Sequence, residues 1–205
     1  MNCDINDIRQ RYDEQAETYD KTIGIVDRLG GIGKLRREFL QRSKGNVLAV
    51  AIGTGIDLPF YPKSCNMTGI DVSEEMLAIA RKRADRLHTG IDLQSMDAEN
   101  LSFPDESFDT VTSTLALCTY PRPIETLREM ARVCKPDGRL LFIEHGRSSS
   151  AVVRSLRWLF AARNLRKHGC HLLRDIVRLV SDAELQVIDH RRALFGIFHG
   201  MEARK

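Results

Sequence analysis

The chain has 205 residues, of which 42% are apolar and 29% are charged. A chain of this length and composition can bury a hydrophobic core in one compact domain, which excludes an intrinsically disordered protein. Its net charge of +3 is too small to indicate a nucleic-acid-binding protein.

The cysteines and the N-terminal segment predict the compartment. The five cysteines are odd in number and show no C-x-x-C spacing. Residues 1–10 contain two aspartates and no apolar run, so they do not resemble a signal peptide. Nowhere does the chain contain the roughly eighteen consecutive apolar residues that would span a bilayer. We therefore expect a cytoplasmic protein with free thiols; the sequence does not indicate an oligomeric state.

The first half of the chain alternates between helical and extended patterns. Val47–Ala51 is a short apolar run that ends in Gly53-Thr54-Gly55, which is typical of a buried strand entering a tight turn. Ser73 is a good helix N-cap, and two glutamates follow it in the first turn. The expected helices cover about 5–19, 33–41, 56–60 and the segment after Ser73, and the expected strands cover 47–51, 66–71 and 91–96.

The second half continues this alternation and then closes with two strands. The last two strands are joined too tightly for a helical crossover, so we expect them to pair antiparallel. The elements expected here are strands over 108–117, 139–144, 185–190 and 194–203, and helices over 124–134 and 172–183.

Strands that alternate with helices predict an α/β fold, with a doubly wound, mostly parallel seven-stranded sheet and a C-terminal antiparallel hairpin. In such a fold a ligand binds in the crevice at the carboxyl ends of the strands. We expect one domain over 1–205, divided into a helical N-terminal cap (1–44), a cofactor-binding core (45–147), a basic lid-like segment (148–168) and a closing helix and hairpin (169–205).

Three features fall at the ends of successive predicted strands. Gly53 and Gly55 lack side chains, so a ligand can approach the backbone closely. Asp71 ends the second strand, where a carboxylate can accept hydrogen bonds from both hydroxyls of a ribose. Asp97 ends the third, where it can meet an adenine amino group. Together they predict a site for an adenosyl ligand. A dinucleotide is opposed by Leu58, which stands where the G-x-G-x-x-G pattern needs its third glycine.

The ordered motifs resemble those of class I S-adenosylmethionine-dependent methyltransferases of the UbiE-like, methyltransferase-11 type. The resemblance covers about residues 45–147. A narrower similarity, to thiol-methyltransferase-like and phospholipid-methyltransferase-like members, rests on Glu144-His145-Gly146 and Gly169-Cys170-His171-Leu172. The motifs that carry the broad resemblance are Val47–Gly55, Gly69–Leu77, Asp97–Phe103 and Cys134–Arg139.

This resemblance implies a Rossmann-like fold and S-adenosyl-L-methionine as the cofactor. It implies that Asp71 holds the ribose hydroxyls, that Asp97 meets the adenine amino group, and that Tyr19 folds over the cofactor. The cofactor contacts that it implies are Tyr19, Gly53, Thr54, Gly55, Asp71, Val72, Met76, Asp97, Ala98 and Leu115.

Two positions depart from the family pattern. An acidic residue usually stands at the position of Ala49, and a glycine at that of Ala51. Loss of the acid predicts weaker cofactor binding, unless another carboxylate replaces it. It also keeps open the alternative of a non-methylating protein that binds S-adenosylmethionine or S-adenosylhomocysteine, or of a cofactor-assisted cyclase.

Methyl transfer from a sulfonium is an in-line displacement, so alignment of the reactants can supply most of the acceleration. We expect a small-molecule or lipid-like acceptor, with the nucleophilic atom (S, N, O or C) left open. His145, after the fifth predicted strand, is the candidate acid–base or orienting residue. Cys118 is a candidate for the acceptor pocket. His168, Cys170 and His171 crowd together but offer no second ligand group at a suitable spacing, so no metal site is expected.

Residues 147–167 are basic and apolar, with six Lys or Arg residues and no acid. Three interpretations stay open for this segment: a lid over the acceptor site that uses Trp158, a helix whose apolar stripe packs on the sheet, and a surface that lies on anionic lipid headgroups. The last one implies peripheral membrane contact.

Overall fold

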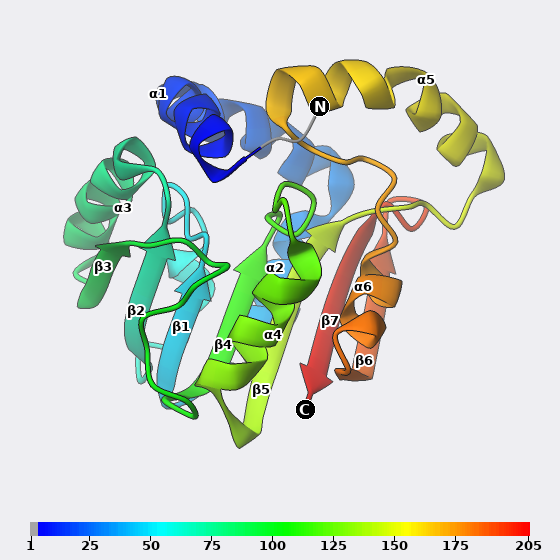
Figure 1. Ribbon diagram of the computed structural model, residues 1–205. Helices are drawn as coiled ribbons and strands as arrows, with labels where there is room; N and C mark the ends of the chain where they lie inside the picture. The colour runs from blue at the N-terminus through cyan, green and yellow to red at the C-terminus, as the bar shows by residue number, and fades with distance from the viewer. Residues whose placement is uncertain (1–3) are drawn as a thin grey trace.

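The computed structural model describes residues 4–205, so Cys3 lies outside it. It also does not describe the side chains of residues 26, 28–30, 167 and 168. Seven strands form one sheet in the order β3-β2-β1-β4-β5-β7-β6 (Figure 1). All neighbouring strands are parallel except β7, which runs antiparallel to both β5 and β6. This confirms the predicted fold class and the closing hairpin. The strands are β1 (Asn46–Val50), β2 (Asn66–Asp71), β3 (Ile91–Ser95), β4 (Phe108–Thr114), β5 (Cys134–His145), β6 (Gln186–Ala193) and β7 (Phe198–Arg204).

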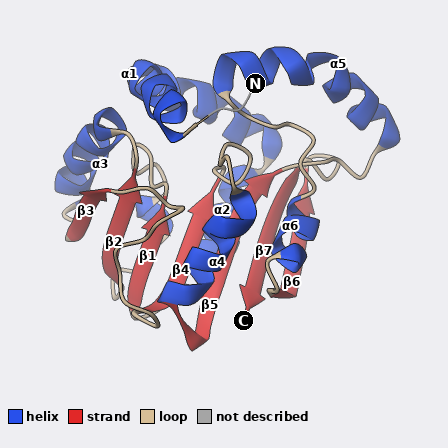
Figure 2. Ribbon diagram, in the orientation of Figure 1, coloured by secondary structure: helices blue, strands red, loops and turns tan. Residues whose placement is uncertain are grey.

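Helices cover both faces of the sheet, and two more lie above the carboxyl ends of the parallel strands (Figure 2). The core on one face includes residues of α4 and α6, and the core on the other includes residues of α2 and α3. Helices α1 and α5 lie along the upper edge in Figure 1. The helices are α1 (Ile5–Gly30), α2 (Ile32–Leu40), α3 (Glu74–Leu87), α4 (Pro123–Val133), α5 (Ala151–His168) and α6 (Ile176–Asp182), with a 3₁₀ turn at Leu58–Phe60.

Several predicted boundaries were wrong, and backbone conformation explains most of them. The predicted strand over 108–117 ends at Thr114, because Leu115 adopts a left-handed φ of 55°. The last strand begins at Phe198 rather than at residue 194, because residues 194–196 all have positive φ and form the hairpin turn. The first helix continues past Tyr19 until Gly31, whose φ of 72° ends it.

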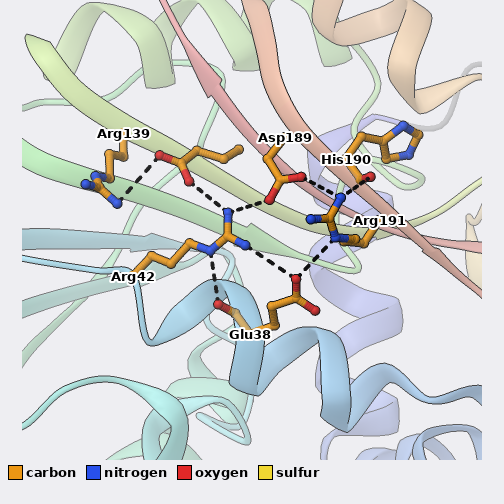
Figure 3. Close-up of polar contacts among 7 residues, drawn as sticks. Glu38, Arg42, Arg139, Asp189, His190 and Arg191 are labelled. Carbon is orange, nitrogen blue, oxygen red and sulfur yellow. Dashed lines mark hydrogen bonds and ion pairs between the residues drawn. The ribbon is translucent and has the colours of Figure 1, made fainter.

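Arg42 fixes α2 to the closing hairpin (Figure 3). One of its guanidinium nitrogens lies 2.8 Å from a carboxylate oxygen of Asp189 and 3.0 Å from one of Glu202. Another lies 3.4 Å from a carboxylate oxygen of Glu38, which is four residues earlier and within α2. Arg42 also stacks 4.3 Å above the ring of Phe39. These contacts hold α2 against the hairpin on the face opposite α4 and α6. Among residues 4–205, no helix is both long and apolar enough to cross a bilayer.

Candidate active site

A cavity opens at the carboxyl ends of β1, β2 and β4, and residues of α1 form part of its wall. This is the crevice at which doubly wound sheets bind ligands. Seven of the ten residues predicted to contact a cofactor line it, although they come from distant parts of the chain. They are Tyr19, Gly53, Asp71, Val72, Met76, Ala98 and Leu115.

Gly53 and Asp71 form the polar part of the cavity wall. Gly53 has a φ of 57°, and a Cβ added to it would meet no heavy atom within 4 Å. Its backbone N–H donates to one carboxylate oxygen of Asp71 at 2.8 Å, and that of Ser73 donates to the other at 2.9 Å. Each oxygen therefore keeps a lone pair for a ligand hydroxyl. Burial raises the pKa of Asp71 to about 6.

Helix α1 closes the cavity with an apolar face. Tyr12 and Tyr19 meet edge to face with ring centroids 6.2 Å apart, and both line the cavity together with Ile5 and Ile8. The helix is held in place because Arg9 donates to the carbonyl of Val72 at 3.1 Å. Sequence reasoning identified Tyr19 but missed the other three residues. Their helical spacing, on one face of a polar helix, was the available signal.

Comparison with known proteins agrees with this geometry. Residues 48–142 match the family described as "Methyltransferase domain". The phosphatidylethanolamine N-methyltransferase of Cereibacter sphaeroides is 37% identical over 147 residues, covering 71% of this chain and 72% of that protein. The chain belongs to the class I S-adenosylmethionine-dependent methyltransferases.

Two further comparisons bear on the fold and on the length of this methyltransferase. A structure of a SAM-dependent methyltransferase from Aquifex aeolicus has a TM-score of 0.70 at 19% identity, covering 93% of this chain and 97% of that chain. The mitochondrial methyltransferase OMS1 of Saccharomyces cerevisiae is 27% identical over 204 residues, covering 90% of this chain. This chain spans only 43% of the length of that yeast relative.

The cavity has the features that S-adenosylmethionine, the cofactor of this family, requires. The open space at Gly53 leaves room beside the backbone, and the Asp71 carboxylate can accept from ribose hydroxyls. Val72, Met76 and Ala98 supply an apolar surface for a flat base. These residues, which were predicted to contact the cofactor, thus line a single cavity.

Three other predicted cofactor residues of this methyltransferase do not border the cavity. Thr54 is buried, and its hydroxyl donates to Asp20 of α1 at 2.6 Å. Gly55 has a φ of 71°, and an added Cβ would come within 3.3 Å of Ala80 in α3, so this glycine permits close helix packing. Asp97 accepts from the backbone N–H of Glu99 at 2.9 Å, inside its own turn. Its contact with adenine stays a prediction.

Two non-glycine residues hold left-handed backbone at the cavity wall. Ala51 has a φ of 52° after β1, and Leu115 has a φ of 55° after β4. This conformation costs about 1–2 kcal/mol for a residue with a Cβ. The usual glycine at position 51 of this family therefore has a conformational reason. Backbone strain of this kind concentrates at functional sites.

Carboxylates from other elements hold the loop after β1, although Ala49 itself is apolar. Ala49 is buried in a core cluster with Leu58 and Leu77. The loop is instead bound by Asp71 at Gly53 and by Asp20 at Thr54. The sequence raised the question of a replacement acid, and these two residues are the structural candidates.

Glu144, at the end of β5, fixes the loop that follows β4. Its carboxylate is fully buried and accepts from the Ser113 hydroxyl at 2.9 Å and from the backbone N–H groups of Ala116 and Leu117 at 3.3 and 3.2 Å. Burial raises the pKa of Glu144 to about 7. The sequence predicted no role for Glu144, because a local sequence pattern does not reveal hydrogen-bond partners that lie far along the chain.

His145 ends β5 but does not line the cavity, and it is paired with a cysteine. Its Nε2 is 3.0 Å from Sγ of Cys170, and its Nδ1 is 3.4 Å from a guanidinium nitrogen of Arg157. Cys118 is buried next to them. The Cys118 thiol and the histidine lower the pKa of the Cys170 thiol, whereas the paired Cys170 and burial raise the pKa of Cys118. The roles predicted for His145 and Cys118 stay predictions. In the structure, both residues belong to one cluster with Cys170.

Trp158 lies outside the cofactor cavity. Its side chain is 68% exposed on α5, where it borders a separate groove with Arg154, Leu159 and Leu173. The interpretation of α5 as a helix packed by an apolar stripe on the sheet is wrong. Apolar side chains around this helix are exposed, and Figure 1 shows it above the edge of the sheet.

Proposed function

We propose that this methyltransferase transfers the methyl group of S-adenosylmethionine to an apolar, lipid-like acceptor that it meets at a membrane surface. In the reaction, the bond between the sulfonium sulfur and the methyl carbon breaks as the bond to the acceptor forms, and S-adenosylhomocysteine leaves. Asp71 and the cavity wall orient the cofactor, and α1 excludes water from it.

The exposed surface of α5 is the observation that carries the acceptor class. Trp158, Leu159 and Phe160 are 68%, 65% and 60% exposed, an unusual density of large apolar side chains for a water-facing helix. Arginines interleave with them, and residues 147–167 contain no acid. Apolar side chains that enter the acyl boundary, together with arginines that meet anionic headgroups, are the pattern of an interfacial helix.

The position of α5 supports the same proposal. Phe195, in the turn of the closing hairpin, is 71% exposed, and its carbonyl accepts from the hydroxyl of Ser148 just before the helix. A further exposed aromatic side chain thus stands in a turn that is bonded to the segment just before α5. Helices α1 and α5 lie along the same edge of the molecule, and α1 lines the cavity, so a membrane against α5 would lie at the end where the cofactor cavity opens. The Cereibacter relative is named for a lipid substrate, which agrees with this acceptor class.

Release of S-adenosylhomocysteine tests the reaction. The full chain is incubated with S-adenosylmethionine and a panel of phenols, thiols, amines and lipids, with and without vesicles that contain anionic phospholipid. We expect product with an apolar acceptor and faster release when vesicles carry that acceptor. Tight cofactor binding without product from any acceptor would instead favour the non-methylating alternative.

Replacing Trp158 with alanine should impair acceptor use and leave cofactor binding unchanged. Loss of this exposed ring is expected to weaken binding to anionic vesicles about tenfold, since one large apolar side chain contributes about 1.5 kcal/mol or more on transfer from water. Vesicle co-sedimentation and calorimetry with S-adenosylhomocysteine measure the two effects. Ile188→Ala, which removes an exposed apolar side chain from β6, is the matched control. Equal vesicle binding by the two variants would contradict the proposal.

A further inference from the structure

Three side chains of types that can bind a metal come from separate segments of the chain and meet in one cluster. Cys118 follows β4, His145 ends β5, and Cys170 follows α5. Sγ of Cys118, a ring nitrogen of His145 and Sγ of Cys170 all lie within 4.8 Å of one another. Both cysteines are buried and His145 is half-buried. As possible metal ligands, the sequence suggested only His168, Cys170 and His171. Cys118 and His145 lie too far away in the chain to form a recognisable metal-binding motif with Cys170.

We propose that Cys118, His145 and Cys170 bind a zinc ion, with a fourth coordination position left open. Two thiolates and one imidazole are donors that suit this borderline-soft cation. Three protein ligands with an open position are the arrangement of zinc sites that bind a substrate or water. Structural zinc sites, by contrast, are closed by four protein ligands.

The loops that carry the thiols are held in place by contacts among the described residues. The backbone N–H of His171 donates to the carbonyl of Cys118 at 2.9 Å, which joins the two cysteine loops directly. The side chain of Asn164 in α5 donates to the carbonyl of Cys170 at 3.0 Å. Arg174 donates to the carbonyls of Leu117 and Tyr120, on either side of Cys118. The ligand atoms are therefore brought together by the fold, and metal binding need not order these loops.

Arg157 is the charged group whose position bears most directly on His145. Its guanidinium lies 3.4 Å from Nδ1, longer than the 2.7–3.2 Å of a good hydrogen bond, whereas its strong contact is with the carbonyl of Gly146. The other ring nitrogen, Nε2, lies 3.0 Å from Sγ of Cys170, so it faces the thiols and is the atom that would bind the cation. Two thiolates neutralise a divalent ion, so the bound site would not repel Arg157 or the nearby Arg174. The competing arrangement is a metal-free thiolate of Cys170 hydrogen-bonded to His145.

The open position would have a consequence for the reaction. Cys118 lies between Ala116 and Thr119, and both of these line the cavity. Cys118, His145 and Cys170 do not line the cavity themselves, and an acceptor thiol that bound at the open position would be deprotonated outright. This consequence rests on the proposed methyl transfer, whereas metal binding itself does not.

Cobalt binding tests the site independently of activity. The reduced, chelator-treated full chain is titrated with Co²⁺ without oxygen, and then with Zn²⁺. We expect one equivalent of Co²⁺ to give thiolate-to-cobalt charge-transfer absorption and intense tetrahedral d–d bands, which Zn²⁺ abolishes. Cys118→Ser, His145→Ala and Cys170→Ser should each weaken binding by about 100-fold or more, because each removes a ligand and loss of an outer-shell partner alone costs about 10- to 100-fold. Cys65→Ser removes a half-buried thiol outside the cluster and should bind like the parent chain.

Alkylation of the unmodified chain gives a second measurement that does not depend on folding of the variants. Bound Zn²⁺ should protect Cys118 and Cys170 from alkylation, as read by mass spectrometry, while the labelling of Cys65 stays the same. Absence of the charge-transfer band at stoichiometric Co²⁺, or equally fast labelling of the two buried thiols and of Cys65 with Zn²⁺ present, would overturn the metal site in favour of the metal-free pair. Calorimetry with S-adenosylhomocysteine on the same samples separates this result from a failure of the cofactor site.

Discussion

Replacing Asp71 with asparagine is expected to weaken S-adenosylhomocysteine binding by about 10- to 150-fold. Hydrogen bonds to a charged group contribute about 1.5–3 kcal/mol, and the carboxylate would lose them at the ribose. Asparagine also has only one acceptor oxygen, so its NH₂ group would face the N–H of either Gly53 or Ser73. Calorimetry measures the affinity, and a thermal melt shows whether the variant is folded.

Asp92→Asn is the matched control, because that carboxylate is exposed on β3 and does not border the cavity. Its substitution should change the affinity less than about tenfold, the value of one ordinary hydrogen bond. The parent chain should also bind more weakly as the pH falls through about 6, because protonation then removes the anion of Asp71. The Asp71→Asn variant should lack that dependence. Similar losses in the two variants would contradict a dominant role for Asp71.

The fold and much of the cofactor cavity follow from local sequence signals. A strand that enters Gly53-Thr54-Gly55 and a carboxylate at the end of the next strand are short-range patterns, and parallel strands bring their ends together. Left-handed backbone at Ala51 and Leu115 carries no such signal, because neither residue type favours it. The boundaries that depended on this conformation were accordingly misplaced.

Side chains whose partners lie far away in the chain could not be predicted from the sequence. The cluster of Cys118, His145 and Cys170 joins three segments whose spacing matches no metal motif. The arrangement of α5 was also undecidable from its pattern, because apolar and basic residues alternate without a single stripe. The exposure of its apolar side chains is known only from the structure, in which other helices cover both faces of the sheet.

Arg36 is a buried cation that joins three parts of the methyltransferase. Its side chain is only 1% exposed and forms ion pairs with Asp27 of α1 and with Asp57, which follows the glycine loop. The N-terminal cap and the loop beside the cofactor cavity are thus fastened through one residue of α2. Burial of such charges is costly, and removal of one partner leaves the others uncompensated.

Arg36→Met is therefore expected to lower the free energy of unfolding by about 3–5 kcal/mol, as measured by urea denaturation. Arg42→Met is the matched control, because the charge of Arg42 is a quarter exposed and its loss should cost about 1 kcal/mol. The triple variant with Asp27→Asn and Asp57→Asn should recover much of the loss, because no carboxylate is then left unpaired in the interior. If the triple variant were no more stable than Arg36→Met alone, packing around the guanidinium would be the cause and the electrostatic explanation would be wrong.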